Sequence, residues 1–129
     1  MKKSIIVVLV FVFALSTMAQ NRPNDCWDGT IAESYDGGDG SFENPYQIAN
    51  PQQLALLAQQ TNFGIGGDAY YVLTDNICLN DNLNVNPYNW IPIGCVVDTV
   101  PFFFTGHFDG NKMTVSGLYY QDENIDAVV

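Results

Sequence analysis

The stretch 104–118 constrains the fold of this chain most, because it consists of two short β-type runs joined by a tight turn. Side chains two residues apart share a face of a strand. Phe104 and Phe108 therefore fall on one face, and Phe103, Thr105 and His107 on the other. The run 109–111, Asp-Gly-Asn, consists of residues that tolerate a positive φ and predicts the turn. The run 113–120 returns to β-forming residues, and its glycine at position 117 predicts a bend or bulge.

The first twenty residues have the pattern of an export signal. Two lysines precede an apolar run that ends near Leu15, and small residues at Thr17 and Ala19 predict cleavage after Ala19. A membrane anchor is the alternative, but the apolar run is short for a bilayer span. No cysteine lies at the new N-terminus to carry a lipid, because Cys26 is seven residues past the cleavage site. We therefore expect residues 1–19 to be a Sec-type signal peptide and residues 20–129 to be one secreted or cell-surface domain.

The exported part is strongly acidic. It keeps Arg22 and Lys112 as its strong bases against all 14 acids of the chain. Nucleic acids and anionic membrane surfaces each need a positive patch, so we expect neither nucleic-acid binding nor membrane insertion after signal cleavage. The acidity itself indicates solubility, with a cation or a basic partner as the alternatives.

Three cysteines, Cys26, Cys78 and Cys95, make an odd number in an oxidising compartment, so at most one intrachain disulfide can form. All three pairings are open. Cys78 with Cys95 is our first expectation, because both lie in β-type segments. No Cys-x-x-Cys spacing occurs, which leaves a zinc site or a thioredoxin-like motif without support.

One helix is predicted over residues 51–62. Asn50 is suited to the N-cap, Pro51 to the first helical position, and Gln53 to the partner position of a capping box. Leucines and alanines at helical spacing predict an apolar stripe, formed by Leu54, Leu57 and Ala58. The glycines at 64, 66 and 67 predict its end.

Strands are predicted around the helix. Residues 46–48 form one short candidate, and residues 69–79 form another with a kink at Asp75–Asn76. A polar loop rich in asparagine follows over residues 80–89. Pro92 interrupts the next apolar run, which indicates an edge or a corner and not a central strand.

The order of these anchors resembles the opening of exported bacterial proteins of the GLUG-repeat type, found on or outside Bacteroides-like cells. The anchors are Gly40-Ser41, Asn44-Pro45-Tyr46, Ile48, Leu54, Leu57-Ala58, Tyr71, Leu73-Thr74, Ile77, Leu79, Trp90, Pro92-Ile93-Gly94, Phe104, Gly106, Phe108 to Asn111, and Val115 to Tyr119. The resemblance covers roughly residues 25–120 and carries no specific activity. It implies an all-β fold with one capping helix, namely the N-terminal cap and first coil or coils of a right-handed parallel β-helix.

Two departures from the family matter. The glycine-rich repeated coils of the family do not occur, and positions 107 and 112 hold His and Lys where small residues are more usual. We therefore expect a cap domain that is incomplete at its C-terminus and marginally stable, because solenoid coils bury their faces against neighbours. The family also implies a corner between two different sheets at 109–112, whereas Asp-Gly between alternating runs is otherwise a hairpin signal.

Candidate sites are few, and we assign no catalytic, cofactor-binding or metal-binding residue. Asp36, Asp39 and Glu43 lie in a glycine-rich loop of the kind calcium favours. Their spacing matches neither an EF-hand loop nor the glycine-rich nonapeptide repeat, so calcium stays open there. His107 is the single histidine and is better explained as an outward-facing strand residue than as a general base. No motif joins it to Ser116 or Thr114 in a triad.

Paired acids and exposed aromatics are the remaining functional features. Glycoside hydrolysis needs two carboxylates across a groove, and a lyase acting on acidic sugars needs more bases than this chain has. The aromatic residues could stack on sugars or pack on a protein, although a structural use is favoured. They are Trp27, Tyr35, Tyr70, Tyr88, Trp90 and Tyr120.

The sequence thus predicts a secreted or cell-surface interaction module, adhesin-like and without catalytic activity of its own. Its partner is unknown and could be a glycan or a protein. A carbohydrate-active enzyme fragment and a truncated non-functional product are the alternatives. Converging carboxylates in a groove with a raised pKa would favour the enzyme, and dispersed acids beside an exposed strand edge would favour the module.

Overall fold

The computed structural model describes residues 26–81 and 86–122. The expected signal peptide, residues 1–19, and the apolar end of the chain lie outside the described residues. The elements follow the order β1 (Tyr46–Ile48), α1 (Pro51–Asn62), β2 (Tyr70–Leu73), β3 (Ile77–Cys78), β4 (Val96–Val97), β5 (Val100–Pro101), β6 (His107–Asp109) and β7 (Val115–Ser116). The described part is therefore mostly short strands with one helix, which confirms the expected class at that level.

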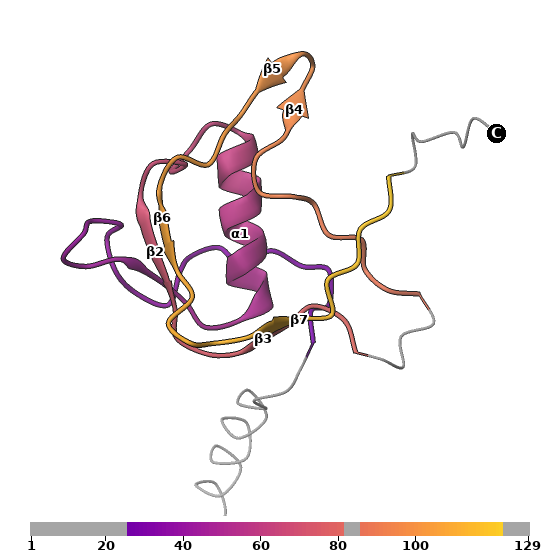
Figure 1. The fold of residues 1–129 in the computed structure, drawn as a ribbon, viewed down its shortest axis with the longest axis horizontal. Coiled ribbons are helices and arrows are strands. Elements are labelled where there is room, and N and C mark those ends of the chain that lie inside the picture. Colours follow the sequence, from indigo (N-terminus) through magenta and orange to yellow (C-terminus); the bar gives the residue numbers. More distant parts are fainter. Residues whose placement is uncertain (1–25, 82–85, 123–129) are drawn as a thin grey trace, which may run out of the picture.

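Parallel pairing organises the strands. The sheet β1-β2-β6 and the pair β3-β7 are both parallel, and only the pair β4-β5 among the described strands is antiparallel. Tyr46, Tyr71 and Phe108 align across the first sheet, and Ile77 aligns with Val115 in the second. In Figure 1, β6 runs beside β2 and β7 beside β3. The segment with β6 and β7 therefore follows the same course as the segment with β2 and β3, and we call each such segment a layer.

The turn after β6 is a corner and not a hairpin, because β6 and β7 pair with two different strands. Met113 donates its N–H to the carbonyl of Gly110 at 2.7 Å. The residues with positive φ are Asn111, at 46°, and Lys112, at 62°. The expectation that 109–111 supplies the left-handed residues is therefore right for Asn111 alone. Lys112, which was not expected there, takes the second left-handed position.

The helix begins as the sequence predicts, with one change in its capping. Asn50 Oδ1 accepts the N–H of Gln53 at 2.9 Å. Gln53 Oε1 accepts the N–H of Ala49 at 2.8 Å, one residue before the cap, so the reciprocal bond of a capping box is displaced. Most of the helix is buried, including Leu56 beside the predicted stripe, and the buried face is wider than predicted because Ala55 is buried too. Figure 1 shows α1 within the outline formed by β2 and β6 on one side and β3 and β7 below.

The core lies between α1 and the middle layer, which contains β2 and β3. Tyr71, Leu73, Ile77 and Leu79 are each 1% exposed, as their alternation predicts. They form one cluster with apolar residues of α1 and with two tryptophans. Trp27 and Trp90 meet edge to face with their ring centroids 5.3 Å apart, so these two aromatics serve the core, as expected.

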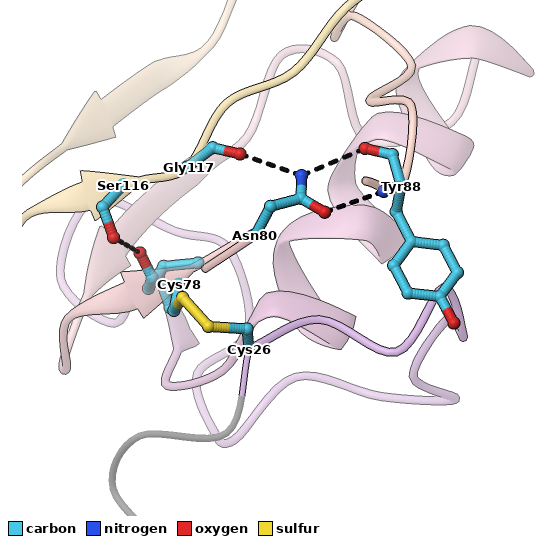
Figure 2. Close-up of a disulfide and its surroundings, with 7 residues drawn as sticks. Cys26, Cys78, Asn80, Tyr88, Ser116 and Gly117 are labelled. Atoms are coloured by element: carbon cyan, nitrogen blue, oxygen red, sulfur yellow. Dashed lines mark hydrogen bonds between the residues drawn. A yellow bond between two sulfur atoms is a disulfide. The ribbon is translucent and has the colours of Figure 1, made fainter. Parts of the chain in front are cut away.

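The disulfide joins Cys26 to Cys78, and Cys95 is a free thiol. Our expectation of a Cys78–Cys95 bond is wrong. Trp27 donates its N–H to the carbonyl of Cys78 at 2.9 Å, which holds the start of the described chain beside β3. Figure 2 shows the disulfide at this place. Cys95 instead lines a pocket beside the C-terminal half of α1, with Ala58 and Phe63.

Asparagine side chains connect the layers at the corners. Asn80 donates its amide to the carbonyls of Gly117, at 2.9 Å, and Tyr88, at 3.1 Å, and its Oδ1 accepts the N–H of Tyr88 at 2.7 Å (Figure 2). A Cβ at Gly117 would lie 1.9 Å from the carbonyl of Asn80, so this close approach requires glycine. Asn76 Oδ1 likewise accepts the N–H of Thr114 at 2.8 Å.

The antiparallel pair β4-β5 was not expected from the sequence. Its two-residue turn consists of Asp98, at φ 47°, and Thr99, at φ 72°. Two-residue hairpin turns usually contain Asn-Gly or Asp-Gly, and this turn has no glycine. The hairpin points away from the helix and the parallel strands in Figure 1.

Candidate interaction surface

The two edges of the sheet β1-β2-β6 differ. The outer edge of β1 is covered, because Asp36 donates its N–H to the carbonyl of Gln47 and Gln47 donates to that of Gly37, both at 2.9 Å. On the other side, no strand in the described part of the chain pairs with the outer edge of β6 or of β7. The described molecule is thus closed at one end and open at the other.

Side-chain exposure changes sharply between the last two layers. Tyr71 of β2 is 1% exposed, whereas Phe108, its neighbour in register on β6, is 39% exposed. Ile77 of β3 is 1% exposed, whereas Val115, its neighbour on β7, is 41% exposed. Leu118 is exposed as well. We call Phe108, Val115 and Leu118, together with the outer backbone edges of β6 and β7, the open face.

Backbone groups on the open face are available for pairing. His107 donates its N–H to the carbonyl of Ala69 at 3.0 Å, and the carbonyls of Thr114 and Ser116 each accept a bond from the β3 side at 2.8 Å. In a parallel ladder alternate residues bond to the same neighbour. Phe108 and Val115 therefore direct their N–H and C=O groups away from the described strands. An exposed edge of this kind is a template for another strand.

The outer face of the same sheet carries an aromatic row. Tyr70 stacks on His107 with centroids 4.4 Å apart and planes 7° apart, and Phe42 meets Tyr70 edge to face at 5.6 Å. His107 lies in β6 with an exposed side chain, as expected. Asp109, two residues on, also belongs to β6, and its Oδ1 accepts the N–H of Asn111 at 2.8 Å. That bond secures the corner.

In the glycine-rich loop, the Asp39 carboxylate accepts hydrogen bonds from its own turn. Asp39 Oδ1 accepts the N–H of Ser41 at 3.0 Å, and hydrogen bonds from the Ser41 side chain and backbone hold the pKa of Asp39 below its usual value. In residues 26–81 and 86–122, no three His, Cys, Asp or Glu residues come together to hold a metal ion. Asp36, Asp39 and Glu43 are therefore not brought into one ligand set.

Asp28, near the start of the described chain, also accepts hydrogen bonds from a residue two positions on. Hydrogen bonds from the side chain and backbone of Thr30 lower the pKa of Asp28. A general acid for glycoside hydrolysis needs a raised carboxyl pKa instead. The lowered pKa values of Asp28 and Asp39 are therefore shifted away from that role.

Two pockets lie beside α1. One, of about 270 Å³, lies between α1 and the 90–95 segment. It is walled by Trp27, Ile31, Phe63, Trp90, Ile91 and Cys95, with no carboxylate among its lining residues. The other, also about 270 Å³, contains the single acid Glu33 beside Tyr35 and Tyr46. Neither pocket brings two carboxylates together.

The remaining candidate aromatics divide by location. Tyr35 is half-buried and donates its hydroxyl to Gln60 Oε1 at 2.7 Å, while Tyr88 and Tyr120 are exposed. Trp27 and Trp90 are buried, and Tyr70 belongs to the aromatic row described above. The expected incomplete cap implies an uncovered last layer, and Phe108 and Val115 are exposed side chains of that layer. Alternation predicts the inward face of Phe108 but not whether anything covers it.

Comparison with family models, curated proteins and solved structures found no match to this chain. Within the described residues, no helix is long and apolar enough to cross a membrane.

Proposed function

We propose that this chain is a secreted or cell-surface interaction module, adhesin-like and without catalytic activity of its own, that binds a partner polypeptide through its open face. In this proposal the described layers are the N-terminal cap and first coils of a right-handed parallel β-helix of the GLUG-repeat type. The signal peptide at 1–19 provides export.

The observation that carries the proposal is the burial step at the last layer. Phe108 and Val115 continue rows whose preceding members, Tyr71 and Ile77, are 1% exposed, yet they are 39% and 41% exposed themselves. Apolar side chains beside a free strand edge are the chemistry used for strand addition, in which backbone bonds give affinity and alternate side chains fill pockets. The dispersed carboxylates also favour a binding module over a glycosidase.

Export is tested by producing residues 1–129 with a C-terminal tag in a bacterium and measuring the intact mass of the released protein. We expect a product that begins at Gln20, found outside the cytoplasm. A full-length product retained in the cytoplasm would contradict the export that the proposal requires.

Binding is tested by photo-crosslinking on intact producing cells, with benzoylphenylalanine at position 108 and, as the matched control, at Phe42. Both positions are exposed aromatics of the same chain, and Phe42 lies outside the open face. We expect a crosslinked polypeptide band at 108 and none at 42. Equal crosslinking at both positions, or none at 108, would contradict binding at the open face. Crosslinking only to polysaccharide would make the partner a glycan.

A further inference from the structure

We propose that the partner at the open face is a second copy of this chain, bound by antiparallel pairing of β6 with β6 about a two-fold axis at Phe108. The inference rests on the proposed function and names its partner. Among the described residues, no strand pairs with the backbone groups on the outer edge of β6.

The backbone of β6 suits such pairing. His107 uses its N–H toward β2, so Phe108, the middle residue of the strand, directs both its N–H and its C=O outward. Two residues directly opposite in an antiparallel pair can exchange both of these bonds. A two-fold axis at Phe108 places the residue opposite its own copy, which satisfies both groups in each chain.

The side chains of β6 are self-complementary in that arrangement. With Phe108 opposite Phe108, His107 of one chain lies opposite Asp109 of the other, and Asp109 opposite His107. An imidazole N–H donor directly across from a carboxylate acceptor is favourable, and the symmetry creates the pair twice. A second copy added in parallel and in register would instead place His107 beside His107 and Asp109 beside Asp109. The charges therefore favour the two-fold arrangement over a repeating head-to-tail one.

The inward side of β6 adds the apolar contribution. Phe108 continues the inward row of Tyr71 and is partly exposed. In the two-fold dimer, the Phe108 rings of the two chains therefore meet where each core is uncovered. Val115 of β7 and Leu118 are exposed on the same open face of each chain. Burying exposed apolar side chains that lie beside a paired edge stabilises a dimer relative to two solvated ends.

The test is sedimentation equilibrium of the exported chain, purified after release, across a range of concentrations. We expect a monomer–dimer equilibrium. Phe108→Pro removes the outward N–H and the apolar ring without removing a bond to β2, and we expect it to weaken dimerisation by at least about tenfold. Phe42→Ala, an exposed aromatic outside β6, should leave the dimer unchanged.

Charge swaps test the register itself. His107→Asp places like charges opposite each other twice in the dimer, and we expect about a tenfold weaker association. The double variant His107→Asp, Asp109→Lys restores opposite pairs and should recover dimerisation. Circular dichroism of each variant controls for loss of the Asp109 bond to Asn111.

Several outcomes would overturn the inference. A wild-type chain that stays monomeric up to about 1 mM, beyond the range of weak specific interfaces, would do so. Species that grow beyond the dimer would point to head-to-tail addition. A double charge swap that fails to recover dimerisation while folded would reject the register. A monomer that still crosslinks through position 108 to another polypeptide would overturn the second copy as partner and leave the proposed function standing.

Discussion

At the scale of single residues, Asn80 shows how a polar side chain can hold two layers together. Its amide makes three hydrogen bonds, to Tyr88 and Gly117, from a nearly buried position. The asparagine-rich composition of residues 80–89 predicts a loop, but it gives no sign of which asparagine is buried. That distinction depends on Gly117, which reaches Asn80 only after the chain has completed another layer.

We expect Asn80→Ala to lower the free energy of unfolding by about 2–4 kcal/mol, because it leaves backbone groups of Tyr88 and Gly117 without their partner. Asn89→Ala is the control. Asn89 is exposed and bonds to Gln121 at the surface, so its loss should cost less than about 1 kcal/mol. Urea unfolding followed by circular dichroism measures both. Equal losses for the two variants would contradict the bridging role of Asn80.

Two tyrosines couple stability to alkaline pH. Burial raises the pKa of Tyr35 and of Tyr71 above the ordinary value, and their hydroxyls donate to Gln60 and Gly66 at 2.7 Å. The unfolded chain then loses protons above about pH 10 while the folded chain keeps them. The stability from these groups is therefore present below about pH 10 and is lost as the pH rises further.

We expect the free energy of unfolding to fall between about pH 9.5 and 11, and to fall less steeply in Tyr35→Phe, which lacks one of the two groups. Tyr120→Phe, which changes an exposed tyrosine, should keep the wild-type slope. Urea titrations in a Cys95→Ser background measure the slope without thiol exchange. The same slope in Tyr35→Phe and wild type would contradict the assignment.

At the scale of elements, local signals decided what could be predicted. The helix was predicted with its bounds because its cap, its first-turn proline and the glycines beyond it are adjacent in the sequence. The kink between β2 and β3 was predicted from Asp75–Asn76. The corner at 109–112 was implied by the family resemblance, because the local Asp-Gly signal alone indicates a hairpin. The β4-β5 hairpin was not, because Asp98 and Thr99 adopt left-handed conformations without the glycine that usually marks such a turn.

A substitution in the β4-β5 turn should increase the stability of the protein. Thr99 is β-branched and lies at φ 72°, a conformation that is costly for such residues. We expect Thr99→Gly to raise the free energy of unfolding by about 1 kcal/mol. Thr114→Gly is the matched control. Thr114 precedes β7 without a positive φ, so glycine there should lower stability by up to about 1 kcal/mol. A loss in both variants would contradict strain at Thr99.

At the scale of the whole molecule, the inward rows were predictable but the contacts between distant segments were not. The alternation of Tyr71, Leu73, Ile77 and Leu79 is visible in the sequence, and their burial followed. The exposure of Phe108 and Val115 depends on which layer comes last. The disulfide was mispredicted for a similar reason: Cys26 reaches β3 through a segment that carries no strand signal of its own.

The disulfide gives the last prediction, which concerns the closed end of the molecule. Cys26 and Cys78 are 52 residues apart, and they tie the start of the described chain to β3. Closing a loop of that length removes unfolded-state entropy worth about 4 kcal/mol in the chain-entropy account. We therefore expect the double variant Cys26→Ser, Cys78→Ser to lose about that much free energy of unfolding, a large share of what a small domain has.

Cys95→Ser is the control, because Cys95 is the free thiol of the three. It should change stability by less than about 1 kcal/mol and remove the one thiol that titrates in denaturant without reductant. Urea unfolding and thiol titration together measure both effects. A large loss in Cys95→Ser, similar to the loss in the double variant, would mean that Cys95 forms the bond with one of the other two cysteines. The attachment of the Trp27 segment to β3 would then be wrong as well, since both rest on the same approach of the chain.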